Sequence, residues 1–308
     1  MSRIAALIPC RDEEVSIAKV VSDFLANENE IDVFIIDNGS LDATAIRARE
    51  AGATVVNCPS PGKSRAIRVG IKYLNTLQNK YDAIVMVDGD DTYDLSNLSS
   101  AIELVVENGF DTAIGTRVIS VDSKLAYRRG HEMGNRLLTG FFNVFFPVKI
   151  KDTLSGYRVM SPQFLNSFVG FGQGFEIEAE LNAHIYALDA SIAEFPCNYS
   201  NRVDGSESKL RTYHDGIKIF TMLFWLFRTE RPKKAFTLLG LPFLFIGLFL
   251  DGRALNGYLD THKVPHFPSL IAGSSSILIF AVLYVSGIIL QGIRLIRVQS
   301  TRREFLKG

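Results

Sequence analysis

The stretch Ile84-Val85-Met86-Val87-Asp88-Gly89-Asp90-Asp91 joins a run of apolar residues to a cluster of carboxylates. A short apolar run bounded by turn residues is typical of a buried strand. Asp88 and Asp90 stand two residues apart at the end of this strand, where alternate residues share a face. Two carboxylates on one face can bind a divalent cation, which prefers oxygen ligands. By itself the cluster is equally compatible with a solvated turn, because short acidic motifs are common.

The chain from residue 1 to about 115 alternates short apolar runs with segments of helical spacing. This alternation predicts an α/β fold with a doubly wound parallel sheet, in which ligands bind at the carboxyl ends of the strands. Polar clusters follow three of these strands, at residues 9–13, 37–40 and 88–90. The predicted strands are residues 4–8, 33–36, 55–56, 84–87 and 112–114, and the predicted helices are residues 14–25, 42–51, 63–77 and 95–107.

Composition excludes some classes of partner. The chain has 33 basic and 33 acidic side chains, so no overall positive field favours nucleic acid. Its three cysteines, Cys10, Cys58 and Cys197, have no metal-binding spacing and suit a reducing compartment. A homo-oligomer is compatible with the sequence, which does not decide between it and a monomer.

Apolar residues crowd the last quarter of the chain. Residues 235–250 and 267–293 carry no charge, and we expect two transmembrane helices at about 233–251 and 268–293 within a membrane region of residues 232–308. The first run covers roughly 24 Å as a helix, short of a hydrocarbon core of about 30 Å, although flanking lysines can extend it. A buried core helix is the alternative for each run.

Basic residues flank these two runs and are sparse between them. The positive-inside rule then places the N-terminal domain, residues 1–212, and the basic tail in the cytoplasm. The protein is expected to be a multi-pass protein of the cell (inner) membrane. No cleavable signal peptide is expected, because charged residues interrupt the apolar start at Arg11. The basic residues are Arg228, Arg231, Lys233 and Lys234 before the first run, and Arg294, Arg297, Arg302, Arg303 and Lys307 after the second.

Two further segments are unusually apolar. Residues 137–147 and residues 217–227 contain many phenylalanine and leucine side chains. Each segment is interpreted either as a helix lying in the membrane interface or as part of the core of the cytoplasmic domain. The second segment lies in residues 213–231, which we expect to form a juxtamembrane amphipathic helix.

The motifs of the chain resemble those of the family-two glycosyltransferases of the GT-A fold, and among them the polyprenyl-phosphate sugar synthases such as dolichol-phosphate mannose synthase and bactoprenol glucosyltransferases. The resemblance spans residues 4 to about 220. The matching blocks are IPCRDEE at 8–14, IIDNGSLDAT at 35–44, PGKSRAIRVGI at 61–71, VDGDD at 87–91, GTR at 115–117 and SGYR at 155–158.

The resemblance implies roles for individual residues. Asp88 and Asp90 would bind Mg²⁺ or Mn²⁺ and take part in catalysis. The nucleotide sugar would be bound by Pro9, Arg11, Glu13, Asp37, Lys63 and Asp88. The phosphate of the acceptor would be bound by Arg117, Arg129, Arg202, Ser206 and Lys209.

Asp152 is the remaining catalytic candidate. A lipid phosphate is already ionised and needs no general base, so Asp152 would then position other groups. With an alcohol as acceptor, Asp152 is the best candidate for the base.

Two departures from the family pattern affect the predicted function. Asn38 replaces the second of two successive acids, which makes the base and ribose contacts less certain. The QxxRW motif of processive synthases is absent, which indicates transfer of one sugar. We therefore expect inverting transfer of a single hexose from a UDP- or GDP-linked sugar to polyprenyl phosphate at the cytoplasmic face of the membrane. The alternatives are transfer to a lipid or saccharide hydroxyl, and a non-catalytic scaffold that binds nucleotide sugars.

Overall fold

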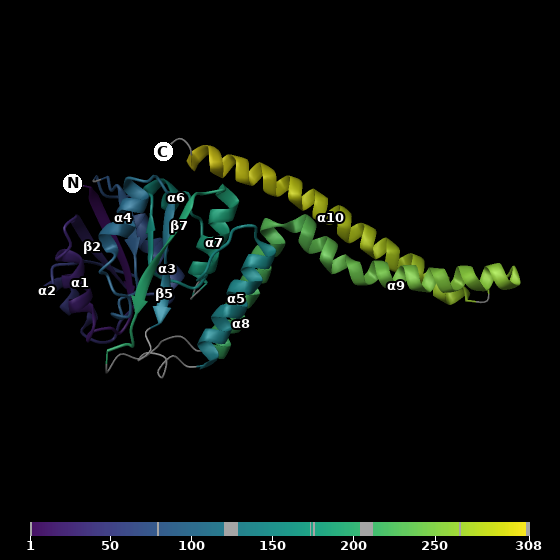
Figure 1. The fold of residues 1–308 in the computed structure, drawn as a ribbon, viewed down its shortest axis with the longest axis horizontal. Helices are drawn as coiled ribbons and strands as arrows, with labels where there is room; N and C mark the ends of the chain where they lie inside the picture. Colours follow the sequence, from purple (N-terminus) through teal and green to yellow (C-terminus); the bar gives the residue numbers. More distant parts are fainter. Residues whose placement is uncertain are drawn as a thin grey trace. The chain divides into compact units, whose positions relative to one another are not determined.

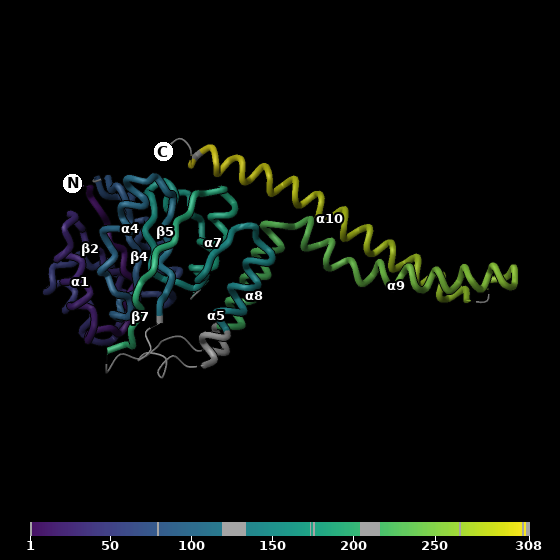
Figure 2. The backbone as a smooth tube through the Cα atoms, in the orientation of Figure 1, coloured from purple at the N-terminus to yellow at the C-terminus, as the bar shows by residue number. Residues whose placement is uncertain are grey.

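The computed structural model describes residues 2–78, 80–119, 129–172, 174, 176–203, 212–264 and 266–305. Figure 2 traces the backbone, coloured from the N-terminus to the C-terminus. The chain forms two compact units, Met1–Leu223 with Thr301–Gly308, and Phe224–Ser300. The division falls inside the helix predicted for residues 213–231.

The first unit alternates strands and helices over most of its length (Figure 1). Its strands are β1 Arg3–Cys10, β2 Glu30–Asp37, β3 Thr54–Asn57, β4 Ala83–Met86, β5 Thr112–Ile119, β6 Arg158–Met160 and β7 Ile192–Tyr199. Its helices are α1 Ile17–Leu25, α2 Thr44–Glu50, α3 Lys63–Leu74, α4 Leu98–Val106, α5 Arg129–Phe145, α6 Pro162–Asn166 and α7 Ile177–Leu188. Helix α8, Thr212–Glu230, crosses from the first unit into the second.

The seven strands form one sheet in the order β3-β2-β1-β4-β6-β5-β7. Neighbouring strands are parallel except for β6, which is antiparallel to both β4 and β5. The parallel arrangement predicted for the first part of the chain is found among β1, β2, β3 and β4, and the antiparallel strand β6 lies outside the predicted strands. Strand β6 has only three residues, too few to show a periodic pattern in the sequence.

Helices cover both faces of the sheet, as expected for a doubly wound fold. Ile4, Ile8 and Ile35 point to one face and form a core with apolar residues of α1 and α4. On the other face, Gly70 of α3 lies against Leu7 and Ile36. Because successive strand residues point to opposite faces, the run from Ile4 to Ile8 is buried throughout.

The strand register aligns the polar clusters predicted from the sequence. Cys10 at the end of β1 pairs with Asp37 at the end of β2, and Leu7 of β1 pairs with Met86 at the end of β4. The loops after β1, β2 and β4 therefore leave the sheet at one edge. This edge carries the candidate site.

The second unit contains α9, Pro232–Thr261, and most of α10, Phe267–Phe305, which form a helical hairpin. Both helices are long and apolar enough to cross a membrane. Glycines allow them to approach closely: a Cβ at Gly247 would lie 2.6 Å from Ile277 Cγ1 and 2.8 Å from the carbonyl oxygen of Gly273. At the other end, Arg294 donates to Glu230 over 3.0 Å.

The chain stays helical beyond the first expected span, which ends at about residue 251. Helix α9 continues to Thr261, and its 30 residues measure about 45 Å. The uncharged run ends before Asp251, and Arg253 and Asp260 follow within the same helix. Charged residues can continue a helix, so the end of the run does not mark the end of α9. The helix instead ends at His262, whose φ of 52° is left-handed.

The apolar segments of α5 and α8 are only partly buried. Phe142 of α5 is fully buried, whereas Val144 is 75% exposed. Ile219 of α8 is likewise buried, whereas Ile217 is 68% exposed. Each helix thus contributes one apolar face to the core and leaves another exposed.

Gly70 provides a test of this packing. Gly70→Ala should lower the stability of the first unit by about 1–3 kcal/mol, because the added methyl group meets Leu7 and Ile36. Gly140→Ala in α5 is the control: no atom lies within 4 Å of the added Cβ, so this change should be neutral or stabilise by up to about 1 kcal/mol. Thermal unfolding followed by circular dichroism measures both. Equal effects would contradict the packing described.

Candidate active site

Asp88, directly after β4, lies beside a buried lysine. Lys63 Nζ is 2.5 Å from Asp88 Oδ1 and 2.6 Å from Glu178 Oε1. Lys63 is the first residue of α3 and Glu178 lies in the first turn of α7, so two helix starts converge on the carboxylate. Gly156 also borders it, since a Cβ there would lie 2.7 Å from Asp88 Oδ2. The glycine of the SGYR block is therefore needed for the loop to pass this close.

Asp90 is buried, with 5% of its side chain exposed. Its Oδ1 accepts two hydrogen bonds from Thr92, from the backbone N at 3.2 Å and from Oγ1 at 2.6 Å. Its Oδ2 lies 2.5 Å from Arg202 Nη2, and Arg202 Nη1 donates to Glu13 Oε1 over 3.0 Å. Arg202 thus joins a carboxylate after β1 to a carboxylate after β4.

The two groups together hold more negative than positive charge. Burial and the charge of Asp88 raise the pKa of Asp90, and Arg202 and Thr92 only partly offset them. Burial alone would lower the pKa of Lys63, but its two carboxylate partners outweigh burial and raise it. Among the described residues four carboxylates contact two cations here, and these residues are Glu13, Asp88, Asp90, Glu178, Lys63 and Arg202.

The donor set suits a divalent cation that binds together with a substrate. Among the described residues no group of three or more histidine, cysteine or acidic side chains forms a complete metal site. Mg²⁺ is commonly held by one or two carboxylates, with substrate phosphates and water completing its shell. Asp88 and Asp90 supply oxygen ligands and excess negative charge, so these residues fit Mg²⁺ or Mn²⁺.

A second ionic cluster is centred on Asp152. Arg117 Nε donates to Asp152 Oδ2 over 2.6 Å, and Arg117 Nη2 donates to Oδ1 over 2.8 Å. Asn135 of α5 adds a bond to Oδ1 at 3.1 Å. Burial tends to raise the pKa of Asp152, but these donors outweigh it and lower the pKa. Asp152 therefore holds Arg117 in place, which favours its positioning role over that of a base.

Two tyrosines connect the clusters. The backbone N–H of Gly156 donates to the Tyr93 hydroxyl over 2.8 Å. The rings of Tyr93 and Tyr199 meet edge to face with centroids 5.1 Å apart, and the guanidinium of Arg117 lies 5.3 Å from the centroid of Tyr199. Tyr199 ends β7, three residues before Arg202, so this strand brings the second arginine to the acidic pair.

The departure at Asn38 has a structural explanation. Its amide Nδ2 donates to the carbonyl oxygens of Cys58 and Ser60, and its Oδ1 accepts from the N–H of Gly62. A carboxylate there would lack the donor and repel both carbonyls. Asn38 therefore shapes the loop that leads to Lys63.

The other predicted donor-site residues lie at the same edge of the sheet. Pro9 is buried at the end of β1, and Arg11 is exposed with its Nε 3.6 Å from Asp12 Oδ2. Asp37 Oδ1 accepts from the N–H of Ser40. Their roles toward a nucleotide sugar stay predictions.

Three of the residues predicted to bind the acceptor phosphate lie wholly or partly outside the described residues. Ser206 and Lys209 lie outside the described residues, and Arg129 begins α5 with a side chain that is also outside them. The sequence reasoning missed Thr92 and Tyr93. An Asp-x-Thr spacing is a recognisable signal for the local bond of Thr92, whereas the contact of Tyr93 with Gly156 joins distant segments and leaves no local pattern.

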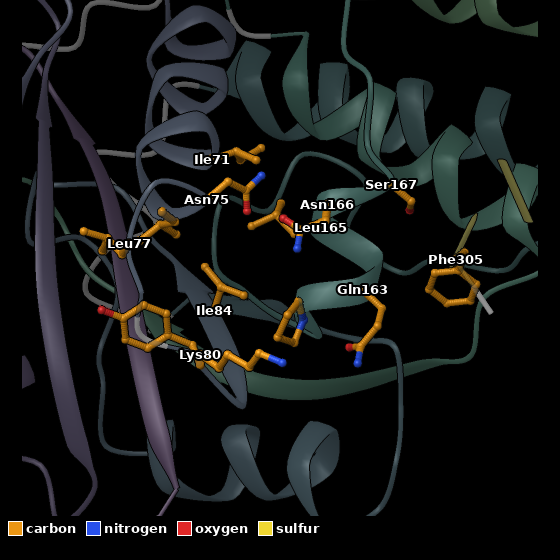
Figure 3. Close-up of a pocket in the computed structure, with 13 residues that line it drawn as sticks. Ile71, Asn75, Leu77, Lys80, Ile84, Gln163, Leu165, Asn166, Ser167 and Phe305 are labelled. Atoms are coloured by element: carbon orange, nitrogen blue, oxygen red, sulfur yellow. The ribbon is translucent and has the colours of Figure 1, made fainter. Parts of the chain in front are cut away.

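A cavity of about 450 Å³ lies elsewhere in the first unit (Figure 3). None of the site residues above lines it. Ile84, near the amino end of β4, is part of its lining, whereas Asp88 follows the carboxyl end. Its other lining residues include Ile71, Asn75, Lys80, Gln163, Leu165 and Phe305.

Comparison with known proteins identifies the family. The family description "Glycosyl transferase family 2" matches residues 5–167. The chain belongs to glycosyltransferase family 2. This glycosyltransferase is 31% identical over 247 residues to glycosyltransferase AglJ of Haloferax volcanii, a match that covers 80% of this chain and 79% of AglJ. It is also 29% identical to the hexosyltransferase Agl6 of the same organism, a match that covers 69% of this chain and 51% of Agl6.

Solved structures confirm the GT-A fold of this glycosyltransferase. Glucosyl-3-phosphoglycerate synthase from Mycobacterium tuberculosis, in complex with Mn²⁺, UDP-glucose and phosphoglyceric acid, superposes with a TM-score of 0.57. The match covers 73% of this chain and 80% of the synthase at 20% identity. At that identity the likeness shows the fold alone.

Asp90 is the most sensitive position to test. If it holds the cation, Asp90→Asn should lower turnover more than a hundredfold, which corresponds to about 2.7 kcal/mol of transition-state stabilisation. Asp91→Asn is a matched control, because Asp91 pairs with Lys19 of α1 at 2.7 Å and not with the site. Hexose transfer is measured with excess Mg²⁺ or Mn²⁺, and folding is checked by circular dichroism. Full activity of Asp90→Asn would contradict the metal-binding role.

Proposed function

We propose that this glycosyltransferase transfers one hexose, with inversion, from a UDP- or GDP-linked sugar to polyprenyl phosphate at the cytoplasmic face of a membrane. The observation that carries the proposal is that Arg202 contacts Asp90 and that Arg117 lies against Tyr199, whose ring packs on Tyr93. Guanidinium groups bind phosphate through paired hydrogen bonds. A site for a neutral hydroxyl acceptor would not need two such cations.

The name of a similar protein supports a lipid phosphate as the acceptor. The chain is 25% identical over 217 residues to a dolichyl-phosphate hexose transferase of Haloferax volcanii, a match that covers 70% of this chain and 90% of the transferase. Dolichyl phosphate is a polyprenyl-type phosphate, which agrees with the acceptor proposed here.

The proposed reaction is a single displacement. An oxygen of the lipid phosphate attacks the anomeric carbon, the bond from this carbon to the nucleoside diphosphate breaks, and the diphosphate leaves with the electron pair. No proton has to be removed from the acceptor, which agrees with an Asp152 whose oxygens are already bonded to Arg117 and Asn135. A divalent cation at Asp88 and Asp90 would stabilise the charge of the departing diphosphate.

The helical hairpin fits this lipid substrate. Helices α9 and α10 would anchor the enzyme in the membrane that contains the acceptor, and the basic residues flanking them favour a cytoplasmic catalytic unit. The exposed apolar faces of α5 and α8 suit the membrane interface.

Acceptor chemistry gives the sharpest test of this function. The purified enzyme should transfer hexose to polyprenyl phosphate at least a hundredfold faster than to the polyprenol of equal chain length, because only the phosphate can attack without a base. A panel of UDP- and GDP-hexoses is assayed with each acceptor, and the products are identified by mass spectrometry. Equal rates with both lipids would support the hydroxyl-acceptor alternative and refute the proposal.

Topology is tested separately with single cysteines. The three native cysteines are buried, so they give little background with a thiol reagent. A cysteine at Thr261, where α9 ends, should react in intact cells with a membrane-impermeant maleimide, whereas a cysteine at Ser300 should react only after the cells are opened. The opposite pattern would place the active site on the outer face.

A further inference from the structure

The hydrogen bonds and the ion pair of the Asp90 carboxylate leave few positions at its two oxygens where a metal ion can bind. Oδ1 accepts both hydrogen bonds of Thr92, which together use the two lone pairs of that oxygen. Oδ2 faces the guanidinium of Arg202 at 2.5 Å. A cation ligated by Asp90 would therefore have to bind Oδ2, where the like charge of the guanidinium of Arg202 would repel it. Because Asp90 is almost fully buried, the carboxylate cannot turn into solvent to offer another position.

Asp88 differs from Asp90 in this respect. Lys63 contacts its Oδ1, while its Oδ2 faces Gly156, which has no side chain. Lys63 is also bonded to Glu178 and can remain in place when a ligand approaches Oδ2. The conflict between a protein cation and a bound metal therefore concerns Arg202 alone among these contacts.

We propose that Arg202 is an internal counter-ion of Asp90 that becomes available to the acceptor phosphate only when a divalent cation displaces it from Oδ2. This inference rests on the proposed function, since it assigns an order to the same site: the cation binds first and the lipid phosphate second. A buried carboxylate without a counter-charge is costly, so the pairing with Arg202 stabilises Asp90. Glu13 holds the guanidinium close by at 3.0 Å.

The proposed competition between Arg202 and the cation predicts changes in the affinity of the protein for the cation, which can be measured. If the cation and Arg202 compete for Asp90, removal of Arg202 must strengthen binding of the cation. If the displaced Arg202 binds a phosphate, the phosphate must also strengthen binding of the cation, because coupling between two ligands is reciprocal.

The first experiment measures Mn²⁺ binding to the full-length protein in detergent, by titration with Mn²⁺ alone and detection of free Mn²⁺ by electron paramagnetic resonance. Arg202→Ala and Arg202→Gln should both bind Mn²⁺ at least tenfold more tightly than the wild type. The control is Arg3→Ala, which removes an arginine paired with Asp32 at the opposite end of β1 and should leave Mn²⁺ affinity unchanged. Equal or weaker binding by both Arg202 variants, with circular dichroism like that of the wild type, overturns the proposal.

The second experiment adds farnesyl phosphate, a short prenyl phosphate, to the same titration. It should tighten Mn²⁺ binding to the wild type several-fold and have no such effect on Arg202→Ala, whereas farnesol should have no effect on either. Absence of tightening in the wild type, or equal tightening by farnesol, overturns the coupling. Neither titration contains a donor sugar, so both report on Arg202 even if hexose transfer to polyprenyl phosphate fails.

Discussion

The burial of negative charge at one edge of the sheet is the constraint on which the active site depends. Strands β1 and β4 end side by side and deliver the buried carboxylates of Glu13 and Asp90 and the partly exposed carboxylate of Asp88 to this edge. Such a group of carboxylates is unfavourable unless cations are brought to it. The chain brings Lys63 at the start of α3 and Arg202 after β7, and these two contacts connect segments far apart in the sequence. The same charge excess that requires these cations makes the site receptive to a metal ion.

The sequence predicted the parts of this arrangement that are local. The apolar run before Asp88 identified β4, and the polar clusters after β1, β2 and β4 identified the edge where the site lies. The motif resemblance named Lys63, Glu13 and Arg202, which the structure brings to the acidic pair. The resemblance assigned these residues to the binding of substrates. In the structure they contact one another.

Other features were beyond sequence reasoning for physical reasons. Strand β6 is recognised only through its partners β4 and β5, because three residues carry no periodicity. The sequence analysis treated Arg117 and Asp152 separately. Only the distance of 2.6 Å between Arg117 Nε and Asp152 Oδ2 reveals that Asp152 orients Arg117. The length of α9 was underestimated because the uncharged run was taken as the helix, although helix formation depends on the backbone and not on hydrophobicity alone.

The contact between Asp251 of α9 and Gly273 and Ser274 of α10 affects how the hairpin can enter a bilayer. Ser274 Oγ donates to Asp251 Oδ2 over 3.3 Å, and Gly273 has no side chain at the point where the carboxylate lies. On insertion scales an aspartate costs about 2.5–3.5 kcal/mol at the centre of a membrane helix. In the membrane anchor proposed above, two helices that entered together would shield this carboxylate between them, whereas α9 entering alone would expose it to lipid. The contact would thus favour insertion of both helices together.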